Sequence, residues 1–177
     1  MSTKNKNLKV KFDVRTIVFL GLLIAIEVVL SRFLSFSVWN IKIGLSFIPI
    51  VIAAMMFGPV QAGIVGALGD FLGATLFPIG AYFPGFTLTA FLTGIVFGLF
   101  LHKKQTLPMI LGAVAINQLI LSQFLNTYWI SVLYGSPFSG LFVTRIVQTL
   151  ILMFVQVAVI LALTKSSAKV FRKKAIA

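Results

Sequence analysis

The stretch Phe86–Leu101 (FTLTAFLTGIVFGLFL) is followed at once by the basic turn 102–106 (HKKQT). The stretch carries no charge and is long enough to cross most of a bilayer as a helix. Pro108 then opens another apolar run, as proline commonly does in a first helical turn. Lys and Arg accumulate on the cytoplasmic side of membrane helices. These residues therefore predict a membrane protein and place this turn inside the cell.

The composition of the whole chain agrees with this interpretation. Of the 177 residues, 59% are hydrophobic and 10% are charged, with a mean hydropathy of +1.09, whereas about a quarter of the residues of a soluble domain are charged. The net charge of +12 is concentrated at the termini and in one turn, which is typical of membrane topology and does not indicate nucleic-acid binding. Because cysteine is absent, disulfides and thiolate metal sites are excluded. We find no metal-ligand, nucleotide-binding or nucleophile motif.

Six apolar segments predict an all-α membrane protein with six transmembrane helices in a single domain, residues 1–177. Residues 1–14 form a basic N-terminal segment, which we expect to be retained because the apolar run after it exceeds a signal-peptide core, and 165–177 form a basic tail. The short second segment contains Pro49, so we expect it to be kinked or partly buried in protein. The expected helices are Arg15–Arg32, Ile43–Phe57, 59–77, Phe86–Leu101, 108–133 and Gly140–Leu163.

The distribution of charge sets the expected orientation. An even number of helices places both termini on one side of the membrane, and a cytoplasmic location collects all but three of the 15 basic residues there. The exceptions are Arg32, Lys42 and Arg145. Since orientation does not require these cations outside, we expect them to have a functional role.

Other polar residues fall in the same outer half. Asp70 lies within the third helix, Gln118, Ser122 and Asn126 recur at helical spacing, and Gln148 follows Arg145 by one turn. Unpaired polar groups are costly in hydrocarbon, so these side chains are expected to face a shared interior. A membrane-embedded carboxylate is by default a functional-site candidate.

The combination predicts a class of ligand. Cations suit a carboxylate, the aromatic residues near the outer boundary suit a flat ring, and a carboxylate with amides suits a heterocycle. Structural alternatives stay open. The cations could lie at lipid headgroups, the aromatics could form an interfacial belt, and Arg145 could pair with Asp70 or Glu27. The polar side chains of Gln118, Ser122 and Asn126 could instead join helices by hydrogen bonds.

Gly21 and Ala25 form a pair of small residues on one face of the first helix. Such pairs permit close helix contact, either within the bundle or with another subunit. The chain shows no means of coupling movement of a solute to energy, so we expect it to depend on a partner.

Three stretches resemble the substrate-binding subunits (S components) of energy-coupling factor (ECF) vitamin transporters, in their folate-specific FolT branch. They are Ile41–Pro49 (IKIGLSFIP), Gly80–Gly94 (GAYFPGFTLTAFLTG) and Asn126–Gly135 (NTYWISVLYG). The resemblance implies a multi-pass protein of a prokaryotic cell membrane that captures folate from outside, with the first outer loop closing over the site. It also implies docking of the coupling subunit EcfT on Gly21 and Ala25. Two ATPase subunits would supply ATP and Mg²⁺ chemistry, so this chain would be no enzyme and would hold no cofactor or metal.

Folate joins a pterin ring to a benzoyl group and a glutamate tail with two carboxylates. Riboflavin and thiamine remain alternative vitamins, although one lacks carboxylates and the other is cationic. An intramembrane enzyme using Glu27 and Asp70, or an assembly protein without a ligand, remains a further alternative. On the folate hypothesis, the tail meets Arg32, Lys42 and Arg145, the pterin edge meets Asp70, Gln123 and Asn126, and the rings stack on Trp39, Tyr82, Phe83 and Trp129.

Overall fold

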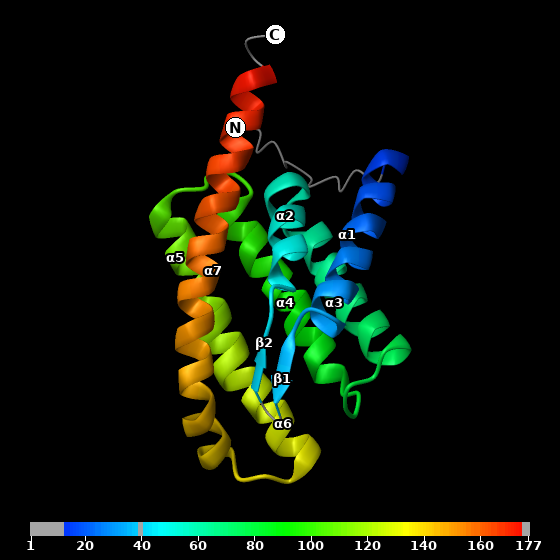
Figure 1. Ribbon diagram of the computed structural model, residues 1–177, viewed down its shortest axis with the longest axis vertical. Coiled ribbons are helices and arrows are strands. Elements are labelled where there is room, and N and C mark those ends of the chain that lie inside the picture. Colours follow the sequence, from blue (N-terminus) through cyan, green and yellow to red (C-terminus); the bar gives the residue numbers. More distant parts are fainter. Residues whose placement is uncertain (1–12, 39–40, 175–177) are drawn as a thin grey trace, which may run out of the picture.

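The computed structural model describes residues 13–38 and 41–174, with side chains described for 13–35 and 44–165. Two three-residue strands pair as an antiparallel hairpin, with Phe36 opposite Ile43. The segments α5, η1 and α6 follow one another without a break from Leu107 to Tyr134. In chain order (Figure 1), the elements are α1 (Val14–Arg32), β1 (Phe36–Val38), β2 (Ile41–Ile43), α2 (Phe47–Phe57), α3 (Pro59–Leu76), α4 (Pro84–Leu101), α5 (Leu107–Ala115), the π-helix η1 (Ile116–Asn126), α6 (Thr127–Tyr134) and α7 (Phe138–Lys174).

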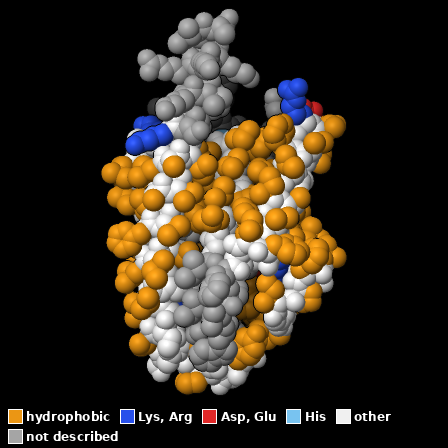
Figure 2. Space-filling view, viewed as in Figure 1, with side chains coloured by type: hydrophobic (Ala, Val, Ile, Leu, Met, Phe, Trp, Pro, Cys, Tyr) orange, Lys and Arg blue, Asp and Glu red, His pale blue; other side chains and the backbone are white. Residues whose placement is uncertain are grey.

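The helices lie side by side, and the chain passes back and forth between two ends of the molecule (Figure 1). The start of α1, the turn 102–106 and the C-terminal end of α7 lie at what we call the basic end, where Lys and Arg side chains gather in Figure 2. The β1–β2 hairpin, the loop 77–83 and the turn 135–137 lie at the opposite, hairpin end. Between the ends the visible surface is largely hydrophobic (Figure 2), as expected of a surface that faces lipid.

Five helical segments are long and apolar enough to cross a membrane: α1, α3, α4, the rod 107–134 and the first 28 residues of α7. The sixth, α2, has 11 residues and is also apolar. Pro49 of α2 is fully buried, so the expectation that this segment lies partly within protein is confirmed.

Glycines allow α3 and α4 to pack closely. A Cβ atom at Gly94 would strike the Ala62 carbonyl, and one at Gly98 would strike the Cα atom of Pro59. Membrane helices associate through such small residues because lipid offers no hydrophobic driving force between them. Besides α3, α4 contacts α2, α5 and η1, so this close pair joins the first and second halves of the chain.

The two halves of the bundle are filled differently. At the basic end, side chains such as Val65, Phe97 and Ile110 are fully buried in one apolar cluster that joins all the long helices. At the hairpin end, the same helices diverge around a cavity. The packed half therefore serves as the frame that holds the walls of the cavity in place.

The expected start of the second helix is wrong, because Ile41–Ile43 form a strand and α2 begins at Phe47. Apart from this short two-stranded hairpin, the described elements are helical, as expected. Pro49 lies in the first turn of α2, where backbone N–H groups need no intrahelical partner, so it causes no kink. The tight turn before α3 is confirmed, since Gly58 has φ +98° and Pro59 begins the helix.

The last helix is also longer than expected. It continues to Lys174, past the expected end at Leu163, so most of the basic tail is helical. The sequence from Leu141 to Lys174 contains neither glycine nor proline, and nothing in it stops the helix where the apolar pattern ends.

Candidate ligand-binding site

A cavity of about 480 Å³ lies within the hairpin end of the bundle, and its volume is typical of small-molecule sites. The last residue of α1, the first turn of α2 and the C-terminal half of α3 form one side. The loop 79–83 and the first half of α4 follow, and η1, α6 and α7 complete the wall. Every helix except α5 therefore contributes to it.

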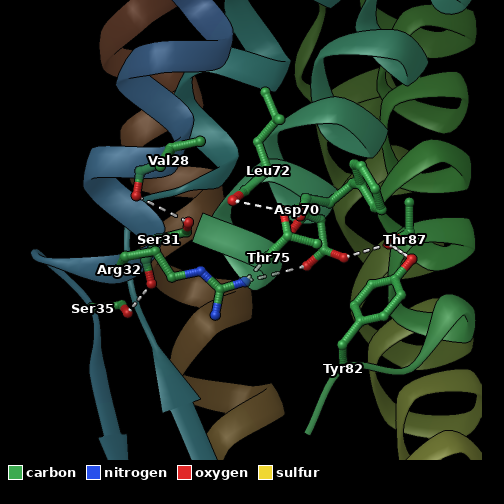
Figure 3. A network of polar contacts seen from close by, with 10 residues as sticks. Val28, Ser31, Arg32, Ser35, Asp70, Leu72, Thr75, Tyr82 and Thr87 are labelled. Atoms are coloured by element: carbon green, nitrogen blue, oxygen red, sulfur yellow. Dashed lines mark hydrogen bonds and ion pairs between the residues drawn. The ribbon is translucent and has the colours of Figure 1, made fainter. Parts of the chain in front are cut away.

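A polar network crosses from α1 to α4 on one side of this cavity (Figure 3). Arg32 Nη2 lies 4.0 Å from Asp70 Oδ1 and donates to the Asp70 carbonyl oxygen at 3.5 Å. Thr87 Oγ1 donates to Asp70 Oδ2 at 2.8 Å. Tyr82 Oη lies 3.2 Å from Thr87 Oγ1, and since the single Thr87 proton goes to Asp70, the tyrosine must donate. The network orders the Asp70 carboxylate beside the Arg32 guanidinium.

The charged side chains of α1 pass over glycines of α3. A Cβ atom at Gly73 would lie 2.7 Å from Arg32 Nε, and one at Gly69 would strike the Glu27 carboxylate. Side chains at these two positions would prevent Arg32 and Glu27 from lying where they do. Glu27 is buried and, unlike Asp70, does not line the cavity.

An aromatic layer forms the next part of the wall. The ring of Phe83 lines the cavity and packs on Trp129, with ring centroids 5.5 Å apart. Trp129 Nε1 donates to Thr89 Oγ1 at 3.1 Å, and Thr89 Oγ1 donates to the Gly85 carbonyl at 3.0 Å. Trp129 itself does not line the cavity. It stands one layer behind Phe83 and supports it.

The wall opposite Asp70 is built by η1 and α7. Ser122 and Asn126 of η1 line the cavity together with Arg145 and Gln148 of α7. Arg145 is only 5% exposed, so its guanidinium is held inside the bundle and does not lie among lipid headgroups.

Gln123 of η1 joins helices and is not part of the cavity wall. Its Nε2 atom donates to the Phe142 carbonyl at 2.6 Å, and its Oε1 atom accepts from Thr149 Oγ1 at 2.6 Å. Gln123 therefore holds η1 to α7, whereas Ser122 and Asn126 of η1 line the cavity.

The structure brings together most of the candidate residues whose side chains it describes. Of the remaining candidates, Gln123 and Trp129 lie behind the wall, Trp39 lies outside the described residues, and Lys42 lies in β2 with a side chain outside them. Sequence reasoning missed Thr87 and Thr89, whose only signal was a pair of hydroxyls in an apolar helix. The candidates that line the cavity are Arg32, Asp70, Tyr82, Phe83, Asn126 and Arg145.

The lining of the cavity combines charged, polar and aromatic groups. The described residues contain no group of three or more His, Cys, Asp or Glu that could hold a metal ion. A guanidinium, a carboxylate, hydroxyls, amides and aromatic rings surround one chamber. This set can hold a flat ligand that carries both hydrogen-bond donors and negative charge.

Comparison with known proteins places the fold in a family. Residues 11–169 match the family described as "ECF-type riboflavin transporter, S component". The chain belongs to this family of transporter S components. It is accordingly a multi-pass membrane protein of a transport system and not an enzyme.

Individual relatives of this S component carry folate in their names. "Folate transporter FolT" of Clostridium novyi (strain NT) is 43% identical over 148 residues, which is 83% of this chain and 86% of the relative. "Folate transporter FolT" of Leuconostoc mesenteroides subsp. mesenteroides is 30% identical over 156 residues, 84% of each chain.

Solved structures agree with the fold. The structure titled "Crystal structure of FolT bound with folic acid" superposes with a TM-score of 0.83 and 36% identity, covering 87% of this S component and 95% of that chain. A second S component, titled "Structure and mechanism of the S component of a bacterial ECF transporter", gives a TM-score of 0.68 at 24% identity over 89% and 98% of the two chains. The second likeness supports the fold alone.

Proposed function

We propose that this S component binds folate in the cavity at the hairpin end and is the substrate-binding subunit of an ATP-driven vitamin importer. The observation that carries the proposal is the match with folic-acid-bound FolT, at a TM-score of 0.83 and 36% identity. The chemistry of the cavity supports it independently. Arg145 and Arg32 provide cationic donors, Asp70 accepts hydrogen bonds, and Tyr82 and Phe83 offer aromatic rings.

The β1–β2 hairpin is the part of the chain best placed to close the site. Gly44 and Ser46, directly after β2, line the cavity. The base of the hairpin is anchored to the end of α1, because Ser35 Oγ donates to the Ser31 carbonyl and a Cβ atom at Gly44 would lie 2.7 Å from Ser35 Cβ. In this proposal, Trp39 and Lys42 complete the site from the hairpin.

The proposal includes an orientation and partners. The basic end faces the cytoplasm of a prokaryotic cell, α2 counts as the sixth span, both termini are cytoplasmic, and the cavity opens outward. Gly21 and Ala25, both exposed on α1, dock the coupling subunit EcfT. Two ATPase subunits hydrolyse ATP with Mg²⁺, so the chain acts as one binding domain without an ATPase or cofactor of its own.

Riboflavin is the second candidate, because the matching family is described by that vitamin. Riboflavin carries no carboxylate for the cationic side chains of the cavity to bind, whereas the two carboxylates of folate suit them.

Binding of a vitamin panel to the purified protein in lipid nanodiscs tests the proposal. We expect saturable binding of folate at one site per chain by isothermal titration calorimetry, and at least a hundredfold weaker binding of riboflavin and thiamine. Tighter binding of riboflavin than of folate would transfer the proposal to the second candidate. Binding of none of them would remove it.

A further inference from the structure

A group of buried amides lies inside the bundle where η1 packs on α7. Asn117 and Gln118 of η1 are each 3% exposed, and Gln156 of α7 is 6% exposed. Leu119 and Ile120, the next residues of η1, are exposed, so the helix turns its amides inward and its apolar side chains outward. Gln156 lines the cavity, whereas Asn117 and Gln118 do not.

The pairing of the two helices places these amides at a similar level. Gln123 of η1 accepts from Thr149 of α7, and the two helices run in opposite directions (Figure 1). Five positions back from Gln123 to Gln118, and seven positions on from Thr149 to Gln156, therefore both lead toward the basic end. Val114, one turn before Gln118, already belongs to the apolar cluster. The amides thus lie between the cavity and that cluster.

Four polar atoms of this group need a partner. The buried atoms Asn117 Nδ2, Asn117 Oδ1, Gln118 Oε1 and Gln156 Oε1 form no hydrogen bond with the part of the chain that the structure describes. Buried polar atoms in folded proteins nearly always have one. The four atoms cannot satisfy one another, because the two N–H bonds of Asn117 Nδ2 can serve both glutamine oxygens and still leave Asn117 Oδ1 without a donor.

We propose that Asn117, Gln118 and Gln156 bind a small cluster of water molecules that continues the cavity toward the basic end. Water suits the group because it both donates to the three oxygens and accepts from Asn117 Nδ2. A cation would serve the oxygens alone, and lipid chains offer no hydrogen-bonding group at this depth. Gln156 belongs to both the cavity wall and the amide group, so it connects the cluster to the cavity.

The connection has a consequence for ligand binding, which rests on the proposed folate function. The cavity is the route by which these waters exchange with the water outside. Folate in the cavity therefore closes the route, and the waters at Asn117 and Gln118 stay enclosed beneath the bound ligand.

Solid-state NMR of the protein in lipid bilayers, with ¹⁵N-labelled Asn and Gln, tests the proposal through magnetisation transfer from water to side-chain amides. We expect rapid transfer to Asn117 and Gln118 without ligand and slower transfer with saturating folate. Gln123 is the matched control, because it is 4% exposed on the same helix and its amide is bonded to the Phe142 carbonyl and to Thr149. The signals are identified by their loss in Asn117→Leu, Gln118→Met and Gln123→Met.

Thermal unfolding of Gln118→Met in the same bilayers provides a second readout. Methionine has a similar size and no amide, so the waters and Asn117 lose a partner and the unfolding midpoint should fall. A dry Gln118 would give the opposite sign, since replacing an unsatisfied buried polar group by an apolar one is stabilising. Leu121→Met measures the effect of methionine alone, because Leu121 is a buried apolar residue of η1.

Each outcome decides one part of the proposal. Transfer to Asn117 and Gln118 no faster than to Gln123 would overturn the water site, and so would a higher unfolding midpoint of Gln118→Met than of Leu121→Met. Transfer that saturating folate leaves unchanged would overturn the connection to the cavity. Protein that binds no folate would contradict the proposed function, while the measurement without ligand would still test the water site.

Discussion

Trp129 was expected to stack on the ligand, and the structure places it one layer away. Its ring supports Phe83 at a centroid distance of 5.5 Å, and its indole N–H holds the Thr89 hydroxyl. Gly85 makes this possible, because a Cβ atom there would lie 2.5 Å from Trp129 Cδ2 and 2.7 Å from Phe83 Cε1. The tryptophan thus shapes the cavity through two residues that line it.

This arrangement predicts the effect of Trp129→Phe. The substitution keeps an aromatic ring and removes the donor to Thr89 Oγ1, so the free energy of unfolding should fall by about 1 kcal/mol. Folate binding should also weaken, because Thr89 and Phe83 both line the cavity. Denaturant titration and calorimetry measure the two effects.

Tyr128→Phe is the control for this prediction. Tyr128 neighbours Trp129 in the chain and touches its ring, but it is 51% exposed. Its hydroxyl can be removed without affecting the wall of the cavity. Equal behaviour of the two variants would show that the indole N–H has no special role.

The residue types of the site could be predicted from the sequence, but not which of them would line the cavity and which would support the lining. Cations, aromatics and amides at the outer ends of helices point to a shared cavity, and Arg32, Asp70 and Arg145 do line one. Whether an aromatic residue forms the inner surface or supports it depends on close contacts such as the one at Gly85, which no spacing rule contains. The same holds for Thr87, whose role depends on Asp70 of another helix.

At the scale of elements, η1 explains why only some of the polar residues expected on one face of the fifth helix line the cavity. The sequence predicts one continuous helix in which Gln118, Ser122 and Asn126 share a face. The rod is continuous, but Ile116–Asn126 form a π-helix, whose i→i+5 hydrogen bonds change the angle between successive side chains. Ser122 and Asn126 line the cavity, while Gln118 is buried outside its lining. Helical segments are recognisable from apolar periodicity, whereas a local change of helix type is not.

The exposed face of α1 leads to a prediction about coupling. A Cβ atom at Gly21 would meet nothing within 4 Å, and Ala25 is exposed one turn later. Gly21→Leu and Ala25→Leu should therefore leave folate binding unchanged and abolish folate uptake in cells, because the larger side chains hold a partner helix away. Uptake of labelled folate and binding to the purified variants provide the two readouts.

Ala162→Leu is the matched control for these substitutions, since Ala162 is an exposed small residue of α7. It should bind and transport folate like the wild type. Normal uptake by Gly21→Leu and Ala25→Leu would show that the coupling subunit docks elsewhere. Loss of binding would point to a role of α1 within the bundle.

At the scale of the whole molecule, the division into a packed half and a hollow half follows from where polar residues occur. An apolar cluster that includes Phe97, Leu101 and Ile160 fills the described interior at the basic end. The charged and amide side chains that line the cavity, such as Arg32, Asp70 and Asn126, lie in the other half, where they require water or a ligand. The sequence predicts this division, because it places the cations that topology does not explain in one half of the bundle.

The chain lacks cysteine, so single engineered thiols can test its orientation in intact cells. Ser139 is exposed at the start of α7, and Gln105 is exposed in the turn after α4 at the opposite end. With the basic end in the cytoplasm, a membrane-impermeant maleimide should label Ser139→Cys in intact cells and Gln105→Cys only after permeabilisation. The expectation follows from the concentration of Lys and Arg at one end, which the positive-inside rule assigns to the cytoplasm. The reverse pattern would open the cavity toward the cytoplasm, where a high-affinity site would retain the vitamin and not capture it from outside. Labelling of both thiols in intact cells would place both on the outer side, which requires an even number of spans between them and excludes the rod 107–134 as a membrane-crossing helix.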